Sequence, residues 1–76
     1  MKNGDTFKIG KREFIVLDDG PVNVTNPYSG ESCMLIPEAI AVYDFIKGAE
    51  MTGTSFHKEL DYFMRKWPSE YMTLLD

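Results

Sequence analysis

The sequence changes character at Pro37. Before this residue, glycine, asparagine, aspartate and proline punctuate short runs of β-type residues, whereas after it apolar residues recur with helical spacing. A chain that keeps its strands and its helices in separate halves is typical of the α+β class. We therefore predict an α+β fold in which residues 1–36 are rich in strands and residues 37–76 are helical.

Four short strands are predicted in the first half. Polar and apolar residues alternate over residues 6–9 and 22–25, as they do in a strand with one buried face. The strongest strand pattern runs over residues 12–18, and a fourth follows over residues 31–36. Turn residues separate these runs, among them Asp19-Gly20-Pro21. The short connections predict a four-stranded antiparallel meander, curled or partly closed like a small barrel.

Three helices are predicted in the second half. Pro37 suits the first turn of a helix, and Thr52-Gly53 is expected to end that helix. The next helix, which Pro68 stops, carries an apolar stripe along one face, formed by Phe56, Leu60, Phe63, Met64 and Trp67. A last short helix is expected to start at Pro68 and to follow directly.

The length and the composition restrict the class of protein. A chain of 76 residues has room for one domain, and its 43% of hydrophobic residues argues against disorder. No run approaches the roughly 18 apolar residues of a membrane-spanning helix, and residues 1–5 lack the apolar core of a signal peptide. The single cysteine, Cys33, has no partner for an internal disulfide. We therefore expect a cytoplasmic protein with no membrane partner.

Few residues offer reactive chemistry. Cys33 and His57 are the only cysteine and the only histidine of the chain. Zinc needs three or four ligands at fixed spacing, and nucleophilic catalysis needs a nucleophile, a base and an orienting group. We expect Cys33 to be an inert thiol in a strand and His57 to be a solvated side chain on a helix. We predict no enzyme, with no catalytic residue, no metal and no cofactor.

Aromatic residues make up 13% of the chain, which is much ring surface for a small core. Tyr28 lies in a turn from which its ring cannot easily reach the core, and Tyr71 and Met72 lie in the last helix. Tyrosine and methionine are favoured at interface centres, although these side chains could also close the core. We predict a protein-binding module with Tyr28, Tyr71 and Met72 at its interface. The sequence does not decide whether the chain forms a homodimer, which would pair the two edges of an open sheet.

The second helix supplies an alternative function. Lys58, Tyr62, Arg65 and Lys66 gather on the face opposite the apolar stripe. Cations beside an aromatic ring can bind phosphates and stack on bases. The net charge of −4 argues against nucleic acid as a partner, and a solvated helix face with an Asp61–Arg65 pair would explain the same pattern. Weak nucleic-acid binding through these four residues is the alternative.

Four segments resemble small proteins of unknown function that are encoded by bacteriophages. They are NPYSGE at 26–31, LIPEAIAVYD at 35–44, GAE at 48–50 and YMTLLD at 71–76. The resemblance implies expression in the cytoplasm of an infected bacterial cell. Short accessory phage proteins often act by binding, so it also implies a host or phage protein as partner. No activity comes with the resemblance, and no functional residue is carried over.

Overall fold

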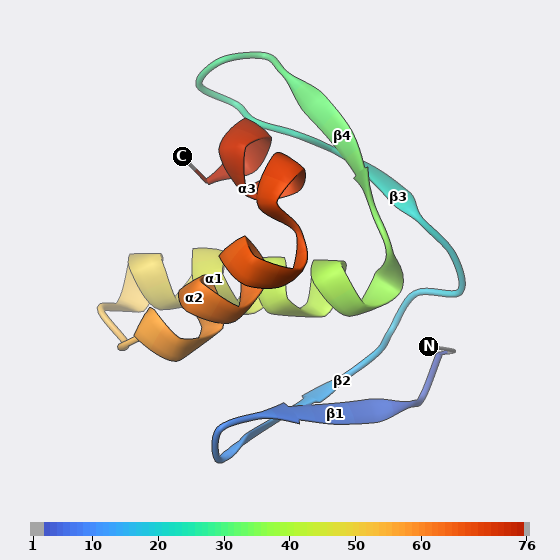
Figure 1. The fold of residues 1–76 in the computed structure, drawn as a ribbon, viewed down its shortest axis with the longest axis vertical. Helices are drawn as coiled ribbons and strands as arrows, with labels where there is room; N and C mark the ends of the chain where they lie inside the picture. Colours follow the sequence, from blue (N-terminus) through green and yellow to red (C-terminus); the bar gives the residue numbers. More distant parts are fainter. Residues whose placement is uncertain (1–2, 76) are drawn as a thin grey trace.

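Strands and helices follow one another in two blocks, which confirms the predicted α+β class (Figure 1). The computed structural model describes residues 3–75. Met1 and Lys2, in the N-terminal segment 1–5, and Asp76, in the segment 71–76, therefore lie outside the described residues. The elements are β1 (Thr6–Ile9), β2 (Arg12–Ile15), β3 (Val22–Thr25), β4 (Ser32–Leu35), α1 (Pro37–Thr52), α2 (His57–Lys66) and α3 (Pro68–Leu74).

The strands form two separate antiparallel hairpins. β1 pairs with β2, with Phe7 opposite Phe14, and β3 pairs with β4, with Val24 opposite Cys33. β2 and β3 belong to different sheets, so the predicted meander is divided in two and no barrel closes. Pro21 lies directly before β3 and has no backbone N–H to donate to a neighbouring strand. Each hairpin packs on a helix instead of on the other hairpin. β1 packs on α2, whereas β4 packs on α3.

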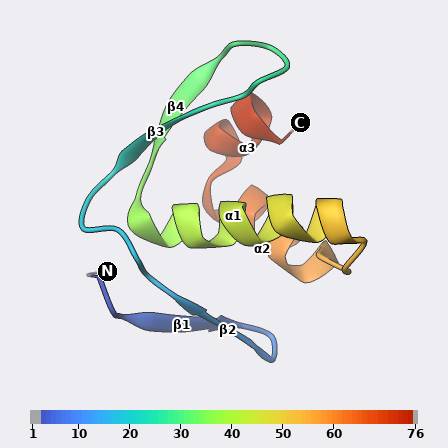
Figure 2. The same cartoon turned by 180° about the vertical axis from the view of Figure 1, so that it is seen from behind.

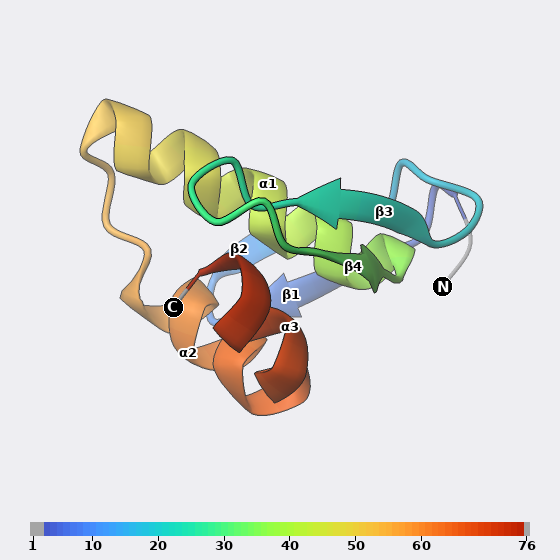
Figure 3. The same ribbon diagram turned by 90° about the horizontal axis from the view of Figure 1, so that it is seen from above.

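The two hairpins lie on opposite sides of the helices. Figures 1 and 2 show α1 running across the middle of the molecule, with β1 and β2 at one end of the long axis and the β3–β4 turn at the other. Seen from above in Figure 3, α2 and α3 lie together on one side of α1. No helix within residues 3–75 is long and apolar enough to cross a membrane.

The limits of α1 follow from local chemistry. Pro37 occupies the first turn, where its missing N–H has no intrahelical partner to lose. The helix ends at Gly53, which adopts a left-handed conformation with φ of 76° and donates its N–H to the carbonyl of Ala49. One face of the helix is buried in the core, with the residues Ala39, Ile40, Val42, Tyr43, Ile46 and Ala49.

The apolar stripe of α2 completes the core. Phe63 is fully buried, and its ring centroid lies 5.2 Å from that of Trp67 and 6.4 Å from that of Tyr43. Leu60 and Trp67 are half-buried against the same cluster, whereas Met64 is exposed. The predicted stripe is therefore confirmed except at Met64.

Candidate functional site

The turn between β3 and β4 is fastened to α3 by one buried side chain. The Asn26 amide donates a hydrogen bond from Nδ2 to the Thr73 carbonyl, at 3.1 Å. Its Oδ1 atom accepts a hydrogen bond from the backbone N–H of Tyr28, at 2.9 Å. Two backbone hydrogen bonds close the same turn, one between the Asn26 N–H and Glu31 and one between the Gly30 N–H and Asn26. The path of residues 26–31 is thus fixed relative to the last helix.

Two exposed side chains flank this connection. Tyr28 follows Asn26 by two residues, and 92% of its surface is exposed. Met72 precedes Thr73 directly, and 68% of its surface is exposed. Because Asn26 joins the backbones of both segments, the two segments that carry these side chains lie next to each other. We call the two side chains the Tyr28–Met72 surface.

Tyr71 has a different environment from its two predicted companions. Its side chain is half-buried and packs against the hydrophobic core. Tyr71 therefore helps to pack α3 against the core. Of the three predicted interface residues, Tyr28 and Met72 are the exposed ones.

Asn26 is a site residue that the sequence did not indicate. An asparagine before a proline signals a turn, because its side chain bonds the backbone two residues on, and the bond to Tyr28 is of this kind. The second bond spans 47 residues to Thr73. No local pattern carries that contact, since it depends on where α3 packs.

Three of the four residues of the alternative nucleic-acid face, Tyr62, Arg65 and Lys66, have partners within the protein. Arg65 forms the predicted ion pair with Asp61, with Nε 3.1 Å from Oδ2. Tyr62 is half-buried, and its ring stacks on Phe7 with the centroids 6.5 Å apart. The ammonium of Lys66 lies 5.7 Å from the centroid of the same ring. A base has little free ring surface to stack on here.

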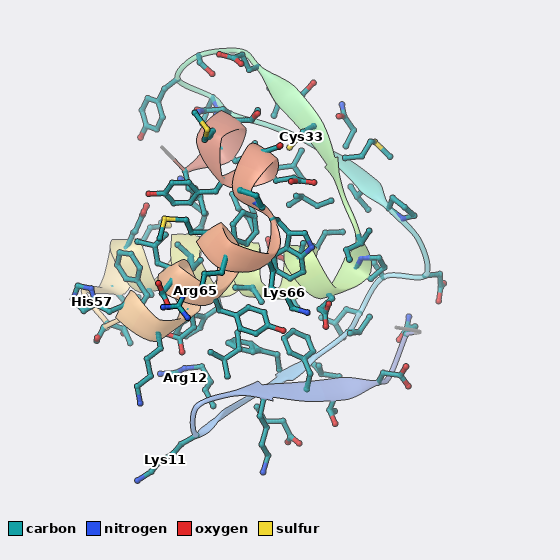
Figure 4. The ribbon with its side chains drawn as sticks, in the orientation of Figure 1. Lys11, Arg12, Cys33, His57, Arg65 and Lys66 are labelled. Carbon is teal, nitrogen blue, oxygen red and sulfur yellow. The ribbon has the colours of Figure 1, made fainter. Side chains whose placement is uncertain are left out.

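Lys58, the fourth member of this face, turns toward the first hairpin. An added Cβ on Gly10, in the β1–β2 turn, would lie 3.3 Å from Cδ and 3.5 Å from Nζ of Lys58. Figure 4 shows Arg65 and Lys66 farther along α2 than His57, with Lys11 and Arg12 near the first hairpin. Lys58 therefore lies near the first hairpin, whereas Arg65 and Lys66 lie farther along α2, so these cations do not form one patch.

Cys33 and His57 are far apart. They lie on opposite sides of the molecule in Figure 4, so the structure does not bring this pair together. Partial burial raises the pKa of the Cys33 thiol, and the nearby Glu70 carboxylate raises it further. Within residues 3–75, no three side chains of the His, Cys, Asp or Glu type gather as metal ligands would.

The Tyr28–Met72 surface is one of several places where large hydrophobic side chains are exposed, and Tyr28 is the most exposed of them. Such a surface can bind another molecule by burying those side chains. Comparisons with protein families, with curated proteins and with solved structures found no match for this chain.

Proposed function

We propose that this chain is a non-enzymatic protein-binding module that uses the Tyr28–Met72 surface. The observation that carries the proposal is the exposure of Tyr28 on a turn that the buried Asn26 amide fixes. A fixed turn loses little conformational entropy when a partner binds, and a tyrosine ring supplies a large contact area. Met72, exposed on the neighbouring segment of α3, would add a side chain that adapts to irregular surfaces.

The cellular setting in this proposal is the cytoplasm of a phage-infected bacterium, with a host or phage protein as partner. It rests on the resemblance of residues 26–76 to phage-encoded proteins and on the single cysteine, which suits a reducing compartment. A second copy of the chain is the other partner to test, because both hairpins leave strand edges unpaired by a further strand.

The experiment compares two variants that truncate exposed apolar side chains. Tyr28→Ala/Met72→Ala removes the proposed surface, whereas Met51→Ala removes a side chain that is 89% exposed on the last turn of α1. Each tagged chain is used to capture proteins from bacterial lysate, with and without nuclease, and sedimentation of the purified chain reports self-association.

We expect the double variant to lose the captured protein while Met51→Ala keeps it. The melting temperatures should stay close to that of the parent chain, since surface changes of this kind usually alter stability by about 0.5 kcal/mol or less. Equal capture by both variants would contradict the proposed surface. Capture that disappears with nuclease would instead support the alternative nucleic-acid face.

A further inference from the structure

A pocket lies between the β1–β2 turn and the first turn of α2, away from the Tyr28–Met72 surface. Its volume is about 300 Å³. The buried residues Ile9 and Glu59 form its floor, and the exposed residues Lys11, Arg12, His57 and Lys58 form its rim. Figure 4 shows Lys11, Arg12 and His57 on the same side of the molecule. The pocket thus combines a cationic rim with a carboxylate at its base, in a chain whose net charge is −4.

Arg12 is held by contacts within the protein, and Lys58 lies close to the β1–β2 turn. The Arg12 guanidinium lies 4.2 Å from the centroid of the Phe45 ring, and its Nε lies 3.7 Å from Oε2 of Glu59. The stem of Lys58 crosses the turn at Gly10, where the absence of a Cβ leaves room for it. The position of the Arg12 guanidinium is therefore fixed before any ligand arrives, which lowers the entropic cost of binding.

The start of α2 adds positive potential to the same place. Phe56 precedes the helix and caps it with no side-chain hydrogen bond. The N–H of Leu60 bonds to the Phe56 carbonyl, so the N–H groups of residues 57–59 precede the first intrahelical bond. Free N–H groups at a helix start attract anions, and phosphate groups above all.

Glu59 gives the pocket a second kind of recognition. Only 5% of its surface is exposed, its contact with Arg12 is longer than a hydrogen bond, and no other described residue pairs with its carboxylate. A buried carboxylate with unused lone pairs favours a ligand that donates a hydrogen bond to it. The ligand chemistry is thus an anionic group at the rim together with a hydroxyl near the floor.

We propose that this pocket binds a small phosphomonoester that carries hydroxyl groups, of the sugar phosphate class. Its phosphate would meet Lys11, Lys58 and the N–H groups of α2, and a sugar hydroxyl would donate to Glu59. The volume lies at the lower end of the range for small-molecule pockets, which suits one sugar ring. The proposal is independent of the protein-binding function, because the two sites share no residue.

The test is an NMR titration of the full ¹⁵N-labelled chain at constant ionic strength, with ribose 5-phosphate, inorganic phosphate and ribose as probes. We expect ribose 5-phosphate to produce saturable shifts at the amides of residues 10–12 and 57–59. Inorganic phosphate should bind about tenfold more weakly, since one charge-assisted hydrogen bond is missing. Ribose alone should produce no saturable shift.

Charge-matched variants show whether the rim carries the binding. Lys11→Gln/Lys58→Gln should weaken ribose 5-phosphate about tenfold or more. Lys8→Gln/Lys47→Gln removes the same charge elsewhere and should change the affinity by less than about twofold, because exposed charges at a distance are screened. If the first double variant loses its folded spectrum, Lys11→Gln alone replaces it, since Lys11 is an exposed turn residue. Equal effects of the two double variants would overturn the site.

Glu59→Gln separates the two parts of the recognition. Without the carboxylate charge, inorganic phosphate should bind more tightly and the advantage of ribose 5-phosphate over it should shrink. Equal affinity of the parent chain for both probes would overturn the phosphomonoester assignment, and the absence of any saturable shift would overturn the pocket as a binding site. None of these results bears on protein capture by the Tyr28–Met72 surface.

Discussion

Asn26 is the residue on which the position of Tyr28 depends, because its amide serves both the turn and α3. We expect Asn26→Ala to lower the free energy of unfolding by about 1–3 kcal/mol, since the Tyr28 N–H and the Thr73 carbonyl both lose a partner. Asn26→Asp keeps the acceptor for Tyr28, and we expect a smaller loss from it. Urea denaturation of each variant measures the change.

The matched control for Asn26 is Asn23→Ala, on the exposed face of β3. This change should alter the free energy of unfolding by no more than about 0.5 kcal/mol. Equal losses in the two alanine variants would show that the Asn26 hydrogen bonds contribute nothing specific.

Cys33 is a residue whose reactivity is set by its neighbours. Partial burial and the Glu70 carboxylate raise the pKa of its thiol, so less thiolate is present at neutral pH than in the unfolded chain. We expect alkylation by iodoacetamide to be slower in the folded chain than in urea. Glu70→Gln should move the rate profile toward lower pH, whereas Glu13→Gln, on the other hairpin, should leave it in place. A profile unchanged by Glu70→Gln would contradict the role of this carboxylate.

At the scale of the elements, α2 carries much of the stability through Phe63. This side chain is 0% exposed and packs on Trp67 and Tyr43. We expect Phe63→Ala to cost about 3–5 kcal/mol, because it leaves a cavity in a core too small to refill it. Most of the stability of so small a domain would be lost, and the thermal transition should broaden or disappear. Met64→Ala, at the exposed neighbouring position, should change the melting temperature little. A sharp and unshifted transition for Phe63→Ala would show that the core does not depend on α2.

The elements also show which features a sequence reveals. The start of α1 at Pro37 and its end at Gly53 are local events, and the sequence predicts both. The pairing of strands is not local. Both hairpins are predicted, but their separation into two sheets depends on the helices that pack between them. A pattern of alternating residues in β2 and β3 carries no information about that choice.

For the whole molecule, the two hairpin turns that contribute to the proposed sites lie toward opposite ends of the long axis (Figures 1 and 2). The β1–β2 turn carries the cationic pocket, and the β3–β4 turn carries Tyr28. The sequence predicts Tyr28 as an interface residue because a turn leaves its ring without a route to the core. It does not predict the pocket, because Lys11 and Lys58 are distant in sequence and their proximity depends on the fold.

The bond between Asn26 and Thr73 has a consequence for the newly made protein. During translation, the turn that carries Tyr28 is synthesised 47 residues before Thr73 is added. Until that residue has left the ribosome and α3 has docked, the Asn26 amide keeps its local bond to Tyr28 but lacks the bond that joins the turn to α3. A nascent chain therefore cannot present the finished Tyr28–Met72 surface before α3 has formed and docked.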